Sequence, residues 1–223
     1  MDKKTTIQAF TRFFSGVLLL GALLFIPAGT FDWWNGWLFM GLLFVPMFVA
    51  GLILMKRNPQ LLRRRLNARE SEQTQRRVIA ASGAMFAAAF ILAGLNRRFG
   101  WVAVPDGVIL AGAAIFLAAY LMYAEVLREN EYLSRTIEVS EGQKVVDTGL
   151  YGVVRHPMYA ATLLLFMSMP LVLGSLLSLA VMLAYPAILV RRILNEEQVL
   201  TRELEGYAEY RQRVKYRLIP GLW

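Results

Sequence analysis

Two clusters of polar residues flank a long uncharged stretch in the second half of the chain. Arg155 and His156 come directly before this stretch, and the cluster Arg191 to Glu197 follows it. Guanidinium, imidazole and carboxylate groups bind polar cofactors and transfer protons. We therefore expect the chemistry of this protein at these two clusters, provided that the fold brings them together.

The uncharged stretch, residues 157–190, is too long for one membrane crossing. Its 34 residues would span roughly 51 Å as a single helix, whereas the hydrocarbon core of a bilayer is about 30 Å thick. Pro170 and the pair Gly174-Ser175 fall near its middle and favour a break there. We predict a hairpin of two short membrane helices, which returns both polar clusters to the same membrane face.

The composition is typical of an integral membrane protein, with 57% hydrophobic and 18% charged residues. Four further uncharged stretches are long enough to cross a bilayer: 13–31, 33–55, 78–96 and 107–124. The sequence therefore predicts an all-α, polytopic integral membrane protein with about six transmembrane helices. The last two would form the C-terminal helical hairpin, followed by an amphipathic cytoplasmic tail.

We expect two regions in this architecture. Residues 1–127 would hold the first four transmembrane helices and a basic cytoplasmic loop at 56–77, which rests on lipid headgroups. Residues 128–223 would be the catalytic region, made of a cytoplasmic flap, the hairpin and the tail, at 128–156, 157–190 and 191–223. Gly142 is suited to a turn in the flap, and Gly206 interrupts a helical stripe of apolar residues in the tail.

The basic residues predict the orientation in the membrane. Of the 24 Lys and Arg residues, all but Arg97 and Arg98 fall on one face of a six-span topology. The positive-inside rule places this face, and with it both termini, in the cytoplasm. Contact with anionic membrane lipids then explains the net charge of +8 without a nucleic-acid partner. The chain has no cysteine and one histidine, which excludes thiol catalysis and argues against a metal centre.

Several motifs lie together from Asn130 onward: the segment 149–159 (GLYGVVRHPMY), Gly174-Ser175, Glu196-Glu197, Tyr207-x-x-Tyr210 and Ile219-Pro220. This combination resembles the isoprenylcysteine carboxyl methyltransferase family and the related phospholipid methyltransferases. The resemblance implies an S-adenosylmethionine-dependent membrane methyltransferase whose cofactor site is built from the last two spans and the tail. It also implies a lipidic or prenylated acceptor, either a small molecule or a protein C-terminus, methylated at the cytoplasmic face.

The site residues follow from these motifs and from residue chemistry. We expect four residues at catalytic positions: Arg155, Arg192, Glu196 and Glu197. We expect cofactor contacts from eight residues: Tyr151, His156, Pro157, Tyr159, Glu197, Leu200, Tyr207 and Tyr210. Pro157 suits the first position of a helix, whose free amide groups, together with the guanidinium of Arg155, would hold a carboxylate.

Structural roles for these residues stay open. Arg155 could instead be a basic membrane anchor, and His156 could cap the helix. The glutamate pair could be a solvated helix segment, and Tyr210 could pack the tail.

Three other functions also stay open. The first is N-methylation of a phospholipid or another lipid amine, for which Glu196 or Glu197 would act as the general base. Carboxyl O-methylation, our leading prediction, needs no base. The second is an NADPH-dependent membrane reductase of the sterol type. The third is a non-catalytic membrane protein, although the lack of charge inside the spans argues against an ion path.

Overall fold

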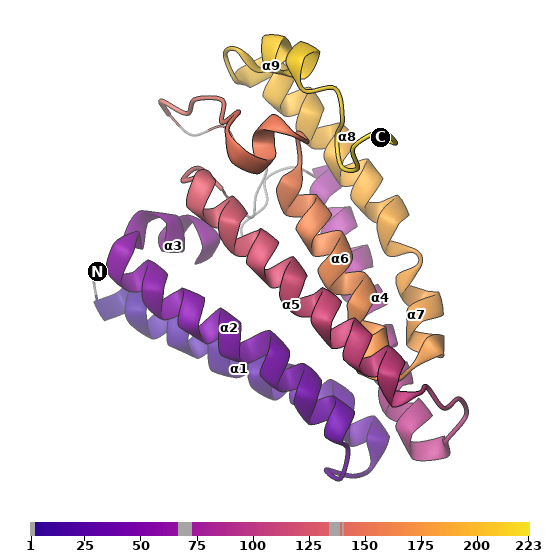
Figure 1. Ribbon diagram of the computed structural model, residues 1–223. Coiled ribbons are helices and arrows are strands. Elements are labelled where there is room, and N and C mark those ends of the chain that lie inside the picture. Colours follow the sequence, from indigo (N-terminus) through magenta and orange to yellow (C-terminus); the bar gives the residue numbers. More distant parts are fainter. Residues whose placement is uncertain (1–2, 67–72, 134–138, 140) are drawn as a thin grey trace.

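In the computed structural model, which describes residues 3–66, 73–133, 139 and 141–223, every regular element is a helix. The predicted all-α, polytopic architecture is thereby confirmed (Figure 1). The elements are α1 (Lys3–Ala28), α2 (Trp34–Arg57), α3 (Pro59–Leu66), α4 (Gln73–Phe99), α5 (Asp106–Glu129), the 3₁₀ turn η1 (Gly149–Gly152), α6 (Pro157–Val172), α7 (Leu176–Met182), α8 (Tyr185–Glu203) and α9 (Tyr207–Arg213).

Among the described residues, five helical segments are long and apolar enough to cross a membrane: Thr5–Ala28, Trp34–Arg57, Ile79–Phe99, Asp106–Glu129 and Leu176–Glu203. Together with the shorter apolar helix α6 they account for the six predicted spans. The 16 residues of α6 reach about 24 Å, somewhat less than the hydrocarbon thickness. We therefore expect Arg155 and His156, which come directly before its first residue, to lie close to the membrane boundary.

The chain reverses direction near the predicted position. Pro170 lies inside the last turns of α6, and the reversal follows at Gly174, whose φ of +67° is in the region that favours glycine. Ser175 then caps α7, because its hydroxyl accepts a hydrogen bond from the amide of Ser178 at 3.2 Å. The returning arm has an additional break between α7 and α8, just before Pro186, which the sequence analysis did not identify.

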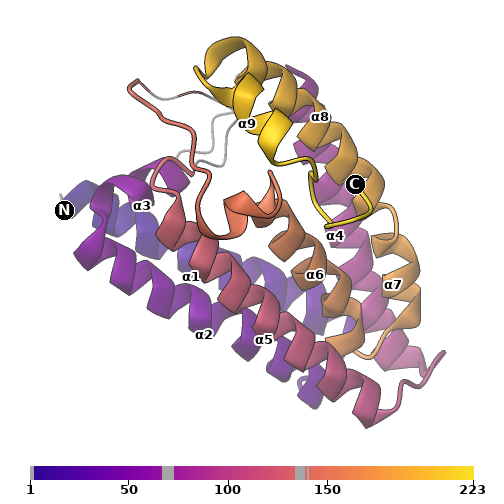
Figure 2. The same cartoon turned by 45° about the horizontal axis from the view of Figure 1, so that its top comes forward.

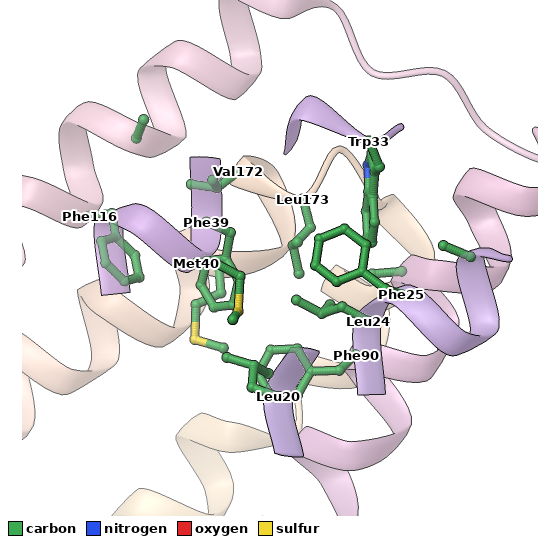
Figure 3. Packing of buried hydrophobic residues seen from close by; sticks show 14 of the residues in the cluster. Leu20, Leu24, Phe25, Trp33, Phe39, Met40, Phe90, Phe116, Val172 and Leu173 are labelled. Atoms are coloured by element: carbon green, nitrogen blue, oxygen red, sulfur yellow. The ribbon is translucent and has the colours of Figure 1, made fainter. Parts of the chain in front are cut away.

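The helices pack most extensively as α5 against α6 and α1 against α4. Helices α5 and α6 run side by side in both ribbon views (Figures 1 and 2). Apolar side chains from α1, α2, α4, α5 and α6 form the largest core cluster, and Figure 3 shows Leu24, Phe39 and Phe116 in it, all fully buried. Glycines allow the closest approaches. A Cβ atom at Gly94 would lie 2.5 Å from the carbonyl oxygen of Leu24, so a larger residue would push α1 away from α4.

Gly94→Ala is therefore expected to lower the thermal unfolding temperature of the protein in detergent by several degrees. Overpacking at a helix contact typically costs about 1–3 kcal/mol. Gly83→Ala, on the same helix, is the control, since a Cβ atom there meets nothing within 4 Å and alanine favours the helix. A Gly94→Ala variant as stable as Gly83→Ala would contradict this packing.

Contacts between distant segments define the two ends of the bundle. At one end, Arg12 donates a hydrogen bond to the carbonyl of Leu66, and Arg65 donates one to the hydroxyl of Tyr123. At the other end, Arg97 donates to the carbonyl of Asp32 at 2.7 Å, and Asn96 donates to the carbonyl of Gly174 at 3.3 Å. The start of α1, the short helix α3 in the predicted basic loop and the end of α5 thus lie at one end, as a six-span topology requires.

The flap and the tail pack on each other at this same end (Figure 2). Gly142 has a φ of +71°, and the described part of the flap contains the 3₁₀ turn η1 and no strand. In the tail the predicted interruption is present: α8 ends at Glu203, and Gly206, with φ +80°, precedes α9. The buried face of the tail contacts the flap through four residues: Leu204, Tyr207, Tyr210 and Val214.

Candidate active site

The Arg155 corner is shaped by the turn that precedes α6. Pro157 occupies the first turn of this helix, as predicted, and His156 is the residue before it. His156 thus occupies the N-cap position that its alternative structural role requires, but its side chain makes no capping hydrogen bond. Instead, the backbone amides of Arg155 and His156 each donate a hydrogen bond of 2.9 Å to the tail, to the carbonyls of Tyr216 and Arg217.

Glu197 is a buried carboxylate that joins this corner to α8 and the tail. Its Oε1 accepts a hydrogen bond from Nε of Arg155 at 2.7 Å and lies 3.3 Å from Nε2 of His156. Its Oε2 accepts one from Nε of Arg217 at 2.9 Å. Two guanidinium groups compensate the cost of burying the carboxylate charge. The prediction that the Arg155 and Glu197 corners are neighbours is confirmed.

The Arg155 side chain donates its hydrogen bonds to other groups of the protein. Besides the contact with Glu197, its Nη1 donates to the carbonyls of Val214 and Lys215, at 2.8 Å each. The side chain is buried, with only 5% of its surface exposed. Arg155 therefore fixes the tail against the start of α6, a different arrangement from the predicted carboxylate-binding fork.

The neighbouring carboxylate, Glu196, belongs to a second hydrogen-bond network, which it forms with Tyr159 and Arg192. The hydroxyl of Tyr159 donates a hydrogen bond to Oε2 of Glu196 and accepts one from Nε of Arg192 at 2.8 Å. The guanidinium of Arg192 also lies 5.8 Å from the centre of the Tyr159 ring. Glu196 remains partly exposed, with 22% of its side chain accessible. A small molecule can therefore reach this carboxylate.

A pocket lies where the flap, the start of α6, α8 and α9 meet. It is an open cleft of about 820 Å³, a volume that includes space continuous with solvent. Its walls combine cationic, acidic and aromatic side chains. The lining residues are Asn130, Tyr132, Leu133, Gln143, Lys144, Val145, Val146, Tyr151, Arg155, His156, Met158, Tyr159, Arg192, Glu196, Leu200, Leu204, Tyr207 and Tyr210.

Another polar group of the pocket wall is the hydroxyl of Tyr207. It is buried and has no hydrogen-bond partner in the part of the chain that the structure describes. Burial raises the pKa of Tyr207 above its ordinary value, so the hydroxyl stays protonated and can donate. A buried donor without a partner costs about 1–3 kcal/mol, which a bound polar molecule would recover.

Most of the predicted site residues line this pocket. They are Tyr151, Arg155, His156, Tyr159, Arg192, Glu196, Leu200, Tyr207 and Tyr210. Glu197 and Pro157 do not line it: the carboxylate of Glu197 is turned towards Arg155 and Arg217, and Pro157 is fully buried.

The role of Arg217 and the pocket contributions of Asn130 and Lys144 were not predicted from the sequence. Arg217 follows the Tyr207-x-x-Tyr210 motif by seven residues and was counted only as a basic residue of the tail. No signal in the sequence indicated this contact, because Arg217 and Glu197 lie 20 residues apart and meet only through the fold of the tail.

One comparison with known proteins falls on this same region. Residues 106–206 match the sequence profile of the phospholipid methyltransferase family. The family resemblance predicted from the motifs is thereby confirmed over this region, which makes up a little less than half of the chain. The matched residues include α5, η1, α6, α7 and α8, together with all of the residues that line the pocket except Tyr207 and Tyr210.

Two individual proteins are also similar to the chain. A Delta(14)-sterol reductase of Mus musculus is 36% identical over 91 residues, which make up 40% of this chain and 22% of the mouse protein. The matched segment thus spans about a fifth of that relative's length. A eukaryotic intramembrane Ras methyltransferase, isoprenylcysteine carboxyl methyltransferase, has the same fold, with a TM-score of 0.56 over 97% of this chain and 85% of that protein, at 15% identity.

Proposed function

We propose that this protein transfers a methyl group from S-adenosylmethionine to a lipid-like acceptor at the cytoplasmic membrane face. The observation that carries the proposal is the pocket itself. It lies next to the start of the apolar helix α6, and the family match covers most of the residues that line it. We take a prenylated cysteine or a similar lipid-linked carboxylate as the leading acceptor.

The lining residues fit the chemical groups of this cofactor, which has an adenine ring, ribose hydroxyls, an ammonium and a carboxylate. Tyr151, Tyr207 and Tyr210 offer aromatic and hydroxyl groups, and Glu196 would accept hydrogen bonds from ribose or ammonium groups. The buried, unpartnered Tyr207 hydroxyl is a donor suited to an acceptor atom of the cofactor. Lys144, which also lines the pocket, would face the carboxylate.

The bound cofactor would supply a methyl group on a positively charged sulfur, which is already activated for transfer. The protein must then align the acceptor and exclude water. Arg155 and Glu197 would do this indirectly, because their ion pair fixes the wall that carries His156. Glu196 would stabilise positive charge in the pocket, and Arg192 would attract an anionic acceptor.

An acceptor carboxylate would react without a general base, since it is already ionised. For a lipid amine a proton must be removed, and Glu196 is then the better candidate of the two glutamates. Glu196 faces the pocket, whereas Glu197 is enclosed by Arg155 and Arg217. The acceptor's lipid tail would stay in the bilayer beside α6, while the polar cofactor would arrive from the cytoplasm.

Transfer of a radiolabelled methyl group tests this proposal. Purified protein would be incubated with labelled S-adenosylmethionine and either prenylcysteine analogues or phospholipid vesicles. We expect label in the prenylcysteine fraction, released by mild base because the product is an ester. Label that resists base and follows the lipid would instead indicate N-methylation, and no label in either fraction would refute methyl transfer to these acceptors.

The match to the mouse sterol reductase supports a second candidate, reduction of a sterol-like substrate with NADPH. A reductase would use the same pocket for a nicotinamide cofactor. Oxidation of NADPH in the presence of unsaturated sterols would favour this candidate, and its absence beside measurable methyl transfer would exclude it.

A further inference from the structure

The last residues of the chain fold back into a closed loop. The backbone carbonyl of Trp223 accepts hydrogen bonds from the amides of Arg217, Leu218 and Ile219, at 3.0, 2.9 and 3.1 Å. Gly221, with φ +81°, adopts the conformation that closes this loop. The guanidinium of Arg217 lies 5.2 Å from the centre of the Trp223 ring, within the range of a cation–π interaction.

This loop is anchored to the membrane helices. Leu218 is buried in a cluster that includes Tyr159 of α6 and Ile193 of α8, and Trp223 packs against the same cluster. The loop therefore rests on the two helices that carry the candidate active site. Leu222, by contrast, is 76% exposed and makes no part of this cluster.

Arg217 connects the loop to the pocket through two routes. Its side chain donates to Oε2 of Glu197, whose Oε1 accepts from Arg155 and contacts His156. Its backbone carbonyl accepts from the amide of His156. Arg155 and His156 line the pocket, whereas Arg217 and Trp223 do not. A substitution in the loop would therefore affect the pocket only through Arg155 and His156.

We propose that Arg217 and Trp223 are positioning residues, which act through Glu197 to hold Arg155 and His156 in place at the pocket wall. The Trp223 ring and carbonyl fix the direction of the Arg217 side chain. Arg217 in turn holds Glu197 between two guanidinium groups. The part of this inference that concerns cofactor affinity rests on the proposed function.

The test compares four variants of the full chain in detergent: Trp223→Ala, Trp223→Phe, Arg217→Gln and the control Leu222→Ala. Hydrogen exchange at the amides of Arg155 and His156 reports their bonds to the tail without any ligand. Titration with S-adenosylmethionine reports the pocket. Exchange in α1 and α5 shows whether each variant remains folded.

We expect Trp223→Ala and Arg217→Gln to accelerate exchange at Arg155 and His156 about tenfold and to weaken cofactor binding about tenfold. Trp223→Phe keeps an aromatic ring beside the Arg217 guanidinium, so its exchange rates and cofactor affinity should stay close to those of the wild type. Leu222→Ala should match the wild type in both measurements. If Trp223→Ala leaves hydrogen exchange at these two amides unchanged, the inference is overturned. Faster exchange with unchanged affinity would also overturn it, because the loop would then only anchor the tail.

Failure of the proposed function gives a different pattern. If the wild type does not bind S-adenosylmethionine, the proposed cofactor is wrong, and the exchange rates at Arg155 and His156 alone then decide whether Arg217 and Trp223 position the wall.

Discussion

Glu197→Gln is expected to reduce S-adenosylmethionine binding at least a hundredfold and to destabilise the protein. The substitution removes the negative charge that lies between Arg155 and Arg217 in a buried site. Breaking a buried ion pair by changing one partner typically costs roughly 3–5 kcal/mol, because the remaining charge is left uncompensated. The loss would release the tail from the start of α6 and so deform the pocket wall. Thermal unfolding and cofactor titration in detergent measure the two effects.

Glu203→Gln is the matched control for this change. Glu203 lies on the same helix, but 42% of its side chain is exposed and its partner is the exposed Arg202. Exposed ion pairs contribute little to stability, so this variant should match the wild type in both measurements. If Glu197→Gln behaves like Glu203→Gln, Glu197 does not hold the wall.

Glu196→Gln is expected to weaken cofactor binding about ten- to a hundredfold while leaving stability nearly unchanged. Its carboxylate lines the pocket and is partly exposed, so the folded protein does not depend on its charge. Hydrogen bonds to a charged group are worth about 1.5–3 kcal/mol, and each 1.4 kcal/mol corresponds to about tenfold in affinity. The same titration and unfolding measurements apply.

The contrast between the two neighbouring glutamates is the informative result. Glu197→Gln should lose both stability and binding, whereas Glu196→Gln should lose binding alone. A Glu196→Gln variant with wild-type affinity would remove Glu196 from the cofactor site. A strongly destabilised one would mean that its bond to Tyr159 supports the fold.

The membrane architecture could be predicted because it follows from simple lengths. Uncharged stretches of 18 residues or more match the bilayer thickness, and 157–190 exceeds it, so the chain had to reverse near Gly174. This reversal also predicted that Arg155 and Glu197 would meet. The break before α8 was harder to predict, because Pro186 can also occupy the first turn of a continuing helix.

The orientation of individual side chains could not be predicted from the sequence in the same way. Glu196 and Glu197 are adjacent in the sequence, but neighbours on a helix point about 100° apart. Only the packed structure turns Glu197 towards the tail and Glu196 towards the pocket. Arg217 and Trp223 were missed for a related reason. Their roles depend on a closed loop formed by backbone hydrogen bonds, for which residue types give little signal.

The most direct test of the account is a titration of the wild-type protein with S-adenosylmethionine and, separately, with NADPH. We predict saturable binding of S-adenosylmethionine that protects the Arg155, His156 and Tyr207 amides from hydrogen exchange, and no binding of NADPH. Folded protein that binds NADPH but not S-adenosylmethionine, or binds S-adenosylmethionine without protecting these amides, would contradict a methyltransferase site in this pocket.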